Sequence, residues 1–456
     1  MVSVGDHETW LPDQSRYLGK PQRRLEDVRF VTGTATFVSD LAGPGISQAV
    51  FVRSLIPHGE LRDVDIGEAA RQPGVVAVFT AGDLDLPDIS RGLRRSGRSM
   101  SRPPLARTRV RYVGEPVAVV IAETREAATD AAEHVWAEIE PLPVVTDPMH
   151  AKDGEALFPE GNVVSRVEVT SDYTLTGDDL PVRVQVELNN QRLAPSPIEG
   201  LAILCEPSGT RLEITCSHQA PHRLRSQISS MLGVEDVRVV VPDVGGAFGL
   251  KGMFFPEYLV VAAAAIRLQK AVMWIERRRE HFLSGTHGRG QMHRVELAGD
   301  ESGRIRRARI EILAEVGAYP HNGAQIPDFT RLVSTGLYDI EHVSVVSTVV
   351  VTNRAPTGSY RGAGRPEAAF AIERAVDAFA RAAGLDPAVV RAQNFIRPES
   401  LPYRTVTGAL YDSGDYEAAL ARALEMVDVN EVRRLQLQRL REGHDPIGLG
   451  IGAFIE

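Results

Sequence analysis

Residues 241–252, VPDVGGAFGLKG, constrain the fold of this chain more than any other stretch. A β-branched run (VRVVV) leads into them and an apolar run (YLVVAAAAI) follows, so the pattern predicts a strand, a glycine-rich loop and a helix. Such loops bring backbone N–H groups close to a phosphate. The spacing fits neither the dinucleotide motif G-x-G-x-x-G nor the nucleotide motif G-x-x-x-x-G-K-[ST], because Gly252 follows Lys251. A nucleotide-binding transferase is therefore disfavoured.

Composition and charge indicate a globular protein and exclude several functions. Hydrophobic residues make up 43% of the 456 residues and charged residues 24%, which is enough apolar surface for several cores. The net charge of −9 argues against a nucleic-acid surface. Two cysteines cannot by themselves ligate an iron–sulfur cluster or a zinc ion. The longest apolar run has nine residues and the N-terminus lacks a signal-like segment, so we expect a cytoplasmic protein without a membrane span.

The chain divides into residues 1–150, 151–424 and 425–456, with the Pro-, Gly- and Asp-rich stretch PVVTDPMHAKDGEALFPEGN as the linker between the first two parts. The first part alternates strands with helical segments, and we expect an α/β domain of βαβ-like units in which Thr124 caps a helix. The second part contains the glycine loop and a further strand–loop–helix unit, whose helix starts near Pro366 and stops at Gly384. The third part ends in PIGLGIGAFIE, which predicts the first strand of another domain.

The second strand–loop–helix unit contains another candidate anion site. Arg361 and Arg365 accompany glycines at the predicted helix N-terminus, where backbone N–H groups favour an anion. We interpret Arg361 as functional, while Arg365 fits a functional role and a surface charge equally well. Two other charged residues, Glu199 and Glu257, are carboxylates without a visible partner.

Histidines offer a zinc site as an alternative. His218 and His222 are four residues apart, which would place them on one face of a helix. The glutamate of an H-E-x-x-H motif is missing, so we interpret them as capping or packing residues.

Six segments carry a resemblance to a known family. In chain order they are VGEPVAVV, LNNQRLAPSPIEG, SHQAPHRLR, VPDVGGAFGLKG, TNRAPTGSYRGAGRPEA and DSGDY. Together they resemble the molybdenum hydroxylases, a family that includes xanthine dehydrogenase, aldehyde oxidase and the large subunit of aerobic carbon monoxide dehydrogenase. The resemblance is greatest to the form II carbon monoxide dehydrogenase-like proteins. It implies a mixed α/β (α+β) chain: an N-terminal α/β hammerhead-type domain (1–150), a molybdopterin-binding domain (151–424) and the start of a second one (425–456).

The resemblance also implies a cofactor, molybdopterin with molybdenum, in bacteria often as the cytosine dinucleotide. In the family the Gly-Gly-x-Phe-Gly loop surrounds this cofactor, a glutamine hydrogen-bonds the apical ligand of the metal, and an arginine loop faces the metal. No side chain of this chain is expected to ligate the metal directly. The matching residues are Gln219, Gly245, Gly246, Ala247, Phe248, Gly249, Arg361, Gly362 and Ala363. From the residues alone, a structural turn and an ordinary buried amide remain alternatives for the loop and for Gln219.

Two departures from the family narrow the expected substrate. Copper-containing carbon monoxide dehydrogenases carry a cysteine after the loop arginine, where this chain has Gly362. Purine-oxidising members carry a glutamate and a phenylalanine on the substrate side, where this chain has Gly252 and Ala363. The resemblance therefore implies an aldehyde or N-heteroaromatic substrate, and true carbon monoxide dehydrogenase is a disfavoured alternative.

A third departure concerns catalysis. The family's general-base glutamate, in a Gly-x-Gly-Glu motif, has no match, so we expect no catalytic residue in this chain and no activity of the chain alone. The resemblance implies a second chain with the C-terminal half, a medium subunit with FAD and a small subunit with [2Fe-2S] clusters. A truncated gene product is the alternative to such a split subunit. A non-catalytic scaffold that keeps the architecture is the alternative function.

Overall fold

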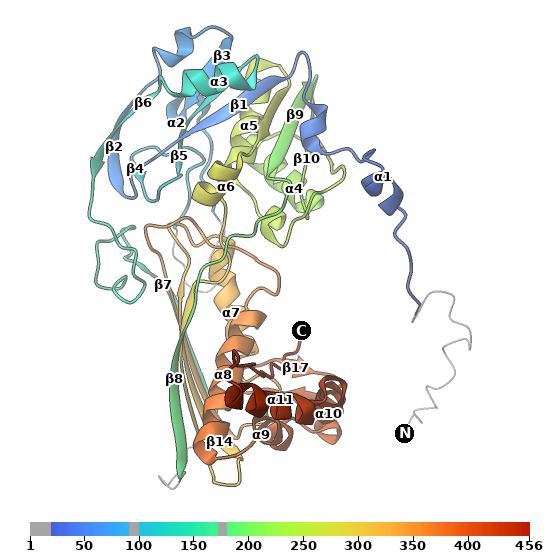
Figure 1. The fold of residues 1–456 in the computed structure, drawn as a ribbon. Helices are drawn as coiled ribbons and strands as arrows, with labels where there is room; N and C mark the ends of the chain where they lie inside the picture. Colours follow the sequence, from blue (N-terminus) through green and yellow to red (C-terminus); the bar gives the residue numbers. More distant parts are fainter. Residues whose placement is uncertain (1–19, 91–99, 172–179) are drawn as a thin grey trace, which may run out of the picture.

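The computed structural model describes residues 20–90, 100–171 and 180–456, which form two lobes (Figure 1). The upper lobe contains a seven-stranded mixed sheet. In spatial order its strands are β11 (Asp236–Val240), β10 (Arg211–Cys216), β9 (Ala202–Ser208), β12 (Val272–Ile275), β1 (Ser47–Arg53), β5 (Pro116–Ala122) and β3 (Val75–Thr80). β1 pairs in parallel with β12, so one sheet joins strands from both sides of residue 150.

The core of the upper lobe lies between this sheet and helix α5 (Pro256–Leu268). The apolar run that the sequence predicts to be helical lies in α5 and is mostly buried. Tyr258 of this helix packs edge-on against Trp274, which packs against Phe51, with ring centroids 6.3 and 5.6 Å apart. The other helices of this lobe are α1 (Asp27–Val31), α2 (Ala81–Leu84), α3 (Arg125–Ala132), α4 (Pro221–Leu232) and α6 (Arg278–Ser284).

The N-terminal part departs from the expected βαβ-like units. β5 lies between β1 and β3 and is antiparallel to both. A βαβ unit needs a crossover helix between neighbouring parallel strands, and here the segment between β1 and β3 contains a strand of another sheet and a single 3₁₀ turn, Ala69–Arg71. That other sheet has the order β4 (Arg109–Val110), β2 (Gly59–Asp65) and β6 (Trp136–Pro141). The Thr124 cap is confirmed, since its hydroxyl accepts a hydrogen bond from the Ala127 N–H at 3.1 Å.

The lower lobe is a five-stranded sheet with α8 (Arg365–Ala383) packed on one face (Figure 1). Its strands, in spatial order, are β7 (Val163–Thr170), β15 (His342–Val350), β14 (Ile305–Glu315), β13 (Gln291–Gly299) and β8 (Val182–Asn190). The predicted ends of α8 are confirmed: Pro366 lies in the first turn and Gly384 ends the helix with φ 70°. Ile372, Val376 and Phe379 are fully buried against the sheet, which fixes the helix on this face.

The C-terminal segment differs from its expected strand. Residues 445–456 form no strand, and side chains of the lower lobe bind two of their backbone groups. Glu373 accepts from the Ala453 N–H at 2.9 Å, and Arg391 donates to the Ile451 carbonyl at 3.1 Å. The remaining elements of this lobe are α7 (Ile326–Leu332), α9 (Pro387–Asn394), β16 (Tyr403–Arg404), β17 (Leu410–Tyr411), α10 (Tyr416–Val427) and α11 (Val429–Arg441). Within the described ranges, no helix has both the length and the apolar character to cross a membrane.

Candidate functional site

The first glycine loop (residues 241–252) connects β11 to α5, as the sequence predicts, and ends in a 3₁₀ turn, Leu250–Gly252. Its glycines allow close approach to other segments. A Cβ at Gly245 would lie 2.5 Å from the Cβ of Glu199. Gly249 combines φ 98° with a Cβ position only 2.8 Å from the carbonyl oxygen of Ser359. A larger residue at either position would push the loop away from its neighbours.

The middle of this loop presents unused backbone donors. The N–H groups of Gly246, Ala247 and Phe248 donate to no group in the part of the chain that the structure describes. Gly246 and Ala247 are half-buried, Phe248 is exposed, and Gly246 and Phe248 both have positive φ. Successive free N–H groups in a turn of this kind form a concave anion-binding surface. Their accessibility fits a phosphate-bearing ligand.

The second glycine loop (residues 359–365) contacts the first. The Arg361 N–H donates to the Phe248 carbonyl at 3.0 Å, so the two strand–loop–helix units meet where the lobes meet. The Arg361 side chain is exposed and has no carboxylate partner among the described residues. Gly362 and Ala363 both have positive φ, at 95° and 41°. Arg365 differs from Arg361, because its guanidinium stacks on Phe329 at 5.2 Å.

Arg289 and Glu367 hold the second loop in place, and the sequence analysis did not single out either residue. Glu367 accepts from the Gly364 N–H at 2.9 Å, and Arg289 lies 3.4 Å from the same carboxylate. Arg289 also donates to the Arg361 carbonyl at 2.9 Å. The position of Glu367, three residues after the glycine at the helix start, is the sequence signal that would have identified it.

Gln219 lies beside the first loop, immediately before α4. Its side-chain carbonyl accepts from the Gly249 N–H at 3.1 Å, and its own backbone N–H donates to the Lys251 carbonyl at 2.9 Å. The side chain is exposed, and its amide NH₂ donates to no described group. The structure therefore brings Gln219 to the loop with a donor left over for a ligand, which differs from a buried amide satisfied on every side.

The two substrate-side residues expected from the resemblance lie on different loops. A Cβ at Gly252 would meet nothing closer than 3.8 Å, where the nearest atom is an Nη of Arg223, so a small side chain fits here in ordinary van der Waals contact. Arg223 also donates to the Gly252 carbonyl. Ala363 lies in the second loop, where its N–H donates to the Tyr360 carbonyl at 2.8 Å.

Glu199 and Glu257 are not lone carboxylates, and that expectation is wrong. Glu257 pairs with Arg53 at 2.8 Å, inside the upper lobe. One oxygen of Glu199 accepts from Lys251 Nζ at 2.6 Å, Ser217 Oγ at 2.7 Å and the Gly245 N–H at 2.8 Å. The sequence did not reveal these partners because each lies at least 18 residues away along the chain. Burial lowers the pKa of Lys251, although the bond to Glu199 opposes this shift.

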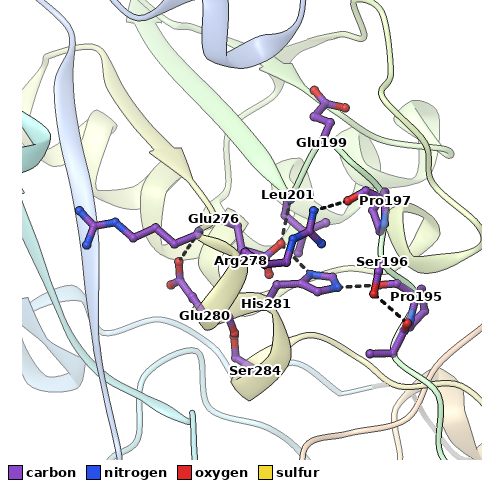
Figure 2. Close-up of polar contacts among 12 residues, drawn as sticks. Pro195, Ser196, Pro197, Glu199, Leu201, Glu276, Arg278, Glu280, His281 and Ser284 are labelled. Carbon is purple, nitrogen blue, oxygen red and sulfur yellow. Dashed lines mark hydrogen bonds and ion pairs between the residues drawn. The ribbon is translucent and has the colours of Figure 1, made fainter.

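Glu199 belongs to residues 195–201, which we call the clamp segment. It has no helix or strand of its own, and residues at the end of β12 and in α6 bind its backbone (Figure 2). His281 bonds the Pro195 carbonyl at 2.6 Å and Glu276 at 2.9 Å, while Arg278 donates to the Pro197 carbonyl. Burial alone would lower the pKa of His281, but the bond to Glu276 and its charge outweigh burial and raise it.

The predicted packing role fits His218. Its ring bonds the Met253 carbonyl at 3.1 Å and accepts from the Ala220 N–H at 2.9 Å. Burial lowers the pKa of His218 to about 4, so it is neutral at pH 7. Within the described ranges, no group of three or more His, Cys, Asp and Glu side chains is arranged to hold a metal ion. Cys205 and Cys216 are buried free thiols.

Two protein families and a solved structure match this chain. The family described as molybdopterin cofactor-binding domain matches residues 160–395. The family described as aldehyde oxidase and xanthine dehydrogenase, a/b hammerhead domain, matches residues 32–143. The solved structure of quinoline 2-oxidoreductase from Pseudomonas putida 86 superposes with a TM-score of 0.88 at 31% identity, covering 92% of this chain and 55% of that one.

Curated relatives give the same picture. The nicotine 6-hydroxylase large subunit of Paenarthrobacter nicotinovorans is 33% identical over 98% of this chain and 56% of its own length. The carbon monoxide dehydrogenase large chain of Hydrogenophaga pseudoflava is 33% identical over 94% and 56%. The chain thus spans about half the length of these relatives. The nicotinate dehydrogenase large molybdopterin subunit of Eubacterium barkeri is 26% identical and is matched over 98% of its length.

Proposed function

Because the chain belongs to the family of molybdenum hydroxylase large subunits, with its hammerhead and molybdopterin cofactor-binding domains, we propose that it is the molybdopterin-binding component of a molybdenum hydroxylase. The single observation that carries this proposal is the meeting of two glycine loops at the Arg361–Phe248 hydrogen bond, beside three unused backbone N–H groups. Backbone donors in a turn without side-chain bulk suit a phosphate-bearing cofactor.

The residues present fit this cofactor, and we assign them roles toward it. The N–H groups from Gly246 to Phe248 would hold phosphate or pterin oxygens, and the free amide NH₂ of Gln219 would donate to a ligand of the metal. Arg361, with Gly362 and Ala363, would approach from the second loop and add a positive charge. When bound, the molybdenum group supplies the redox centre for taking two electrons from a substrate that gains an oxygen atom from water.

The full reaction of the family uses groups that have no match among these 456 residues. We propose that a second chain or a C-terminal half supplies the general-base glutamate and the rest of the cofactor site, and that residues 1–456 alone are inactive. Electrons would leave through [2Fe-2S] clusters on a small subunit to FAD on a medium subunit. We further propose the cytosine dinucleotide form of the cofactor and a cytoplasmic complex.

For the substrate we propose an aldehyde or an N-heteroaromatic compound. Gly252 and Ala363 leave the substrate side without the carboxylate and aromatic ring of purine-oxidising family members. Two of the relatives are named for nicotine and quinoline, which are N-heteroaromatic compounds. A carbon monoxide dehydrogenase is disfavoured because Gly362 offers no soft ligand for copper.

The experiment that tests this function is analysis of the protein purified from its native source. Molybdenum, pterin and nucleotide released by acid are measured together with the native mass. One molybdenum per chain, in a complex with further chains that carry flavin and iron–sulfur clusters, is the expected result and justifies a screen of aldehydes and N-heterocycles. A lone chain of 49.7 kDa without molybdenum or pterin would instead favour the non-catalytic scaffold.

A further inference from the structure

The clamp segment (residues 195–201) connects two parts of the upper lobe that are distant in sequence. On one side, His281 and Arg278 of α6 bind its carbonyl groups, and Glu276 accepts from the Leu201 N–H at 3.0 Å (Figure 2). On the other side, the Glu199 N–H donates to the Gly245 carbonyl at 3.1 Å. The segment is therefore held firmly by α6 while its one carboxylate faces the first glycine loop.

Within that loop, Glu199 binds both ends of the turn. A single carboxylate oxygen accepts from the Gly245 N–H at the start of the turn, at 2.8 Å, and from Lys251 Nζ at its end, at 2.6 Å. The Lys251 side chain is 0% exposed and that of Glu199 is 12% exposed, so little water competes for these bonds. Between these two anchored ends lie the residues whose N–H groups have no described acceptor.

We propose that Glu199 is a positioning residue, which fixes the first glycine loop so that its free N–H groups converge on the cofactor. The inference rests on the proposed function, since the pterin is the ligand toward which the loop is positioned. Glu199 acts through the loop: its bonded oxygen is occupied by three donors of this chain, with Ser217 Oγ as the third at 2.7 Å. Without this carboxylate, the Gly245 N–H and Lys251 Nζ lose their common acceptor, and the ends of the turn keep only the backbone bonds from the Glu199 N–H to the Gly245 carbonyl and from the Gln219 N–H to the Lys251 carbonyl.

A pair of variants separates positioning from simple charge balance. Glu199→Leu alone removes the acceptor but leaves the Lys251 ammonium buried without a counter-charge. Glu199→Leu combined with Lys251→Met replaces the ion pair by apolar side chains, a change that buried ion pairs tolerate with little loss of stability. Glu206→Gln, in strand β9 and outside the site, is the control. Each protein is prepared as the complex in which the native chain occurs.

Two measurements are made on each variant. Hydrogen–deuterium exchange, followed by mass spectrometry with fragment ions across residues 241–252, reports the protection of the Gly245 N–H. Molybdenum and pterin content per chain reports binding. In the double variant we expect exchange at Gly245 to rise about tenfold or more, because a bond to a charged acceptor is lost. The melting temperature should fall less than in Glu199→Leu alone, because Ser217 Oγ and the Gly245 N–H lose an acceptor in both variants but only the single variant leaves a buried charge unpaired. We expect cofactor content to fall at least severalfold, with the control unchanged.

The outcomes are distinguishable from those that test the function. A double variant that keeps both wild-type protection at Gly245 and wild-type cofactor content would overturn the proposal, since Glu199 would then serve only to balance Lys251. If the wild-type complex itself contains no pterin, the proposed function fails, whereas the exchange comparison still decides whether Glu199 positions the loop.

Discussion

The first and second glycine loops each place a backbone N–H on a carboxylate that is also bonded to a cation. In the first loop the carboxylate is Glu199, which lies 46 residues before Gly245 and belongs to a separate segment. In the second loop it is Glu367, which lies three residues after Gly364 in the first turn of α8. The first loop is therefore positioned by tertiary contacts, and the second largely by the start of its own helix.

This difference determines how the stability of each loop responds to substitution of its anchoring residues. Glu367 lies at the positive end of a helix that stabilises its charge even without Arg289. Glu199 has no helix N-terminus beside it and depends on Lys251 and on two hydrogen bonds. We therefore expect the first loop to be the more sensitive of the two to single changes in its anchoring residues.

The largest expected effect is that of Lys251→Met. It leaves the Glu199 carboxylate buried without a cation, and we expect the free energy of unfolding to fall by about 3–5 kcal/mol. Arg289→Met, the equivalent change at the second loop, should cost less, about 1–3 kcal/mol, because its contact with Glu367 is longer, at 3.4 Å. Urea denaturation of both variants makes the comparison, and an equal or larger loss for Arg289→Met would contradict it.

A smaller effect is expected from Gly249→Ala. Its φ of 98° and the 2.8 Å approach to the Ser359 carbonyl force strain on any Cβ, and we expect a loss of about 1–3 kcal/mol. Gly252→Ala is the control within the same loop, since its Cβ would meet nothing closer than 3.8 Å and should change stability by no more than about 0.5 kcal/mol. Thermal unfolding distinguishes the two. Equal melting temperatures for both variants would contradict this prediction. They would show that the contact between Gly249 and the Ser359 carbonyl adjusts to a Cβ without a loss of stability.

Glu367→Gln is expected to have a still smaller effect. The amide keeps an acceptor for the Gly364 N–H but loses the charge that interacts with the α8 N-terminus and Arg289, at a cost of about 1 kcal/mol. Urea denaturation at low and high salt measures it, with Glu399→Gln as an exposed control. If Glu367→Gln destabilises the protein as much as Lys251→Met does, the first turn of α8 is not what stabilises the second loop, and the comparison between the two loops is wrong.

The smallest expected effect is a pH dependence confined to the first loop. The pKa of His281 is raised by Glu276, so the stability from its charged form is fully present below its ordinary pKa of 6.5 and is lost as pH rises through the raised value. After correction for the intrinsic rise of amide exchange with pH, we expect the protection of residues 241–252 to decrease over that window, while the protection of residues 359–365 stays constant. His218 and His287, whose burial lowers the pKa to about 4, titrate on the acid side of this window.

His281→Asn tests the origin of that pH dependence. The variant should abolish the loss of protection above pH 6.5, because the group that titrates there is gone. A pH dependence that persists unchanged in His281→Asn would show that another group controls the clamp segment.

Several elements of the fold followed from local sequence signals. The strand VVAVFT, the Thr124 cap and the ends of α8 at Pro366 and Gly384 appear in the structure where the pattern predicts them. Capping groups and turn residues act within a few positions of the chain, so the sequence contains the whole interaction. Both glycine loops were located for the same reason, although the roles assigned to their residues stay predictions.

Two predictions failed, the C-terminal strand and the βαβ-like units, because both depend on contacts between segments that are distant along the chain. PIGLGIGAFIE has the composition of a strand, but a strand exists only if a neighbouring backbone pairs with it, and side chains of Glu373 and Arg391 bind this segment instead. The expected βαβ-like units failed because pairing with β5 made β1 and β3 antiparallel to their neighbour. For β1 and β3 the strands were predicted correctly and only their pairing was wrong, whereas for PIGLGIGAFIE the strand itself is absent.

The sequence by itself therefore determined the family, the two glycine loops and the local ends of their elements, since these depend on residue types at short spacing. The tertiary structure alone decided that Glu199 faces Gly245 and Lys251, that Gln219 bonds to Gly249, and that the two loops meet at Arg361. These contacts join segments tens of residues apart or more, and their formation depends on how the seven-stranded sheet and the lower lobe bring those segments together. A pattern of residue types along one chain contains no measure of that proximity.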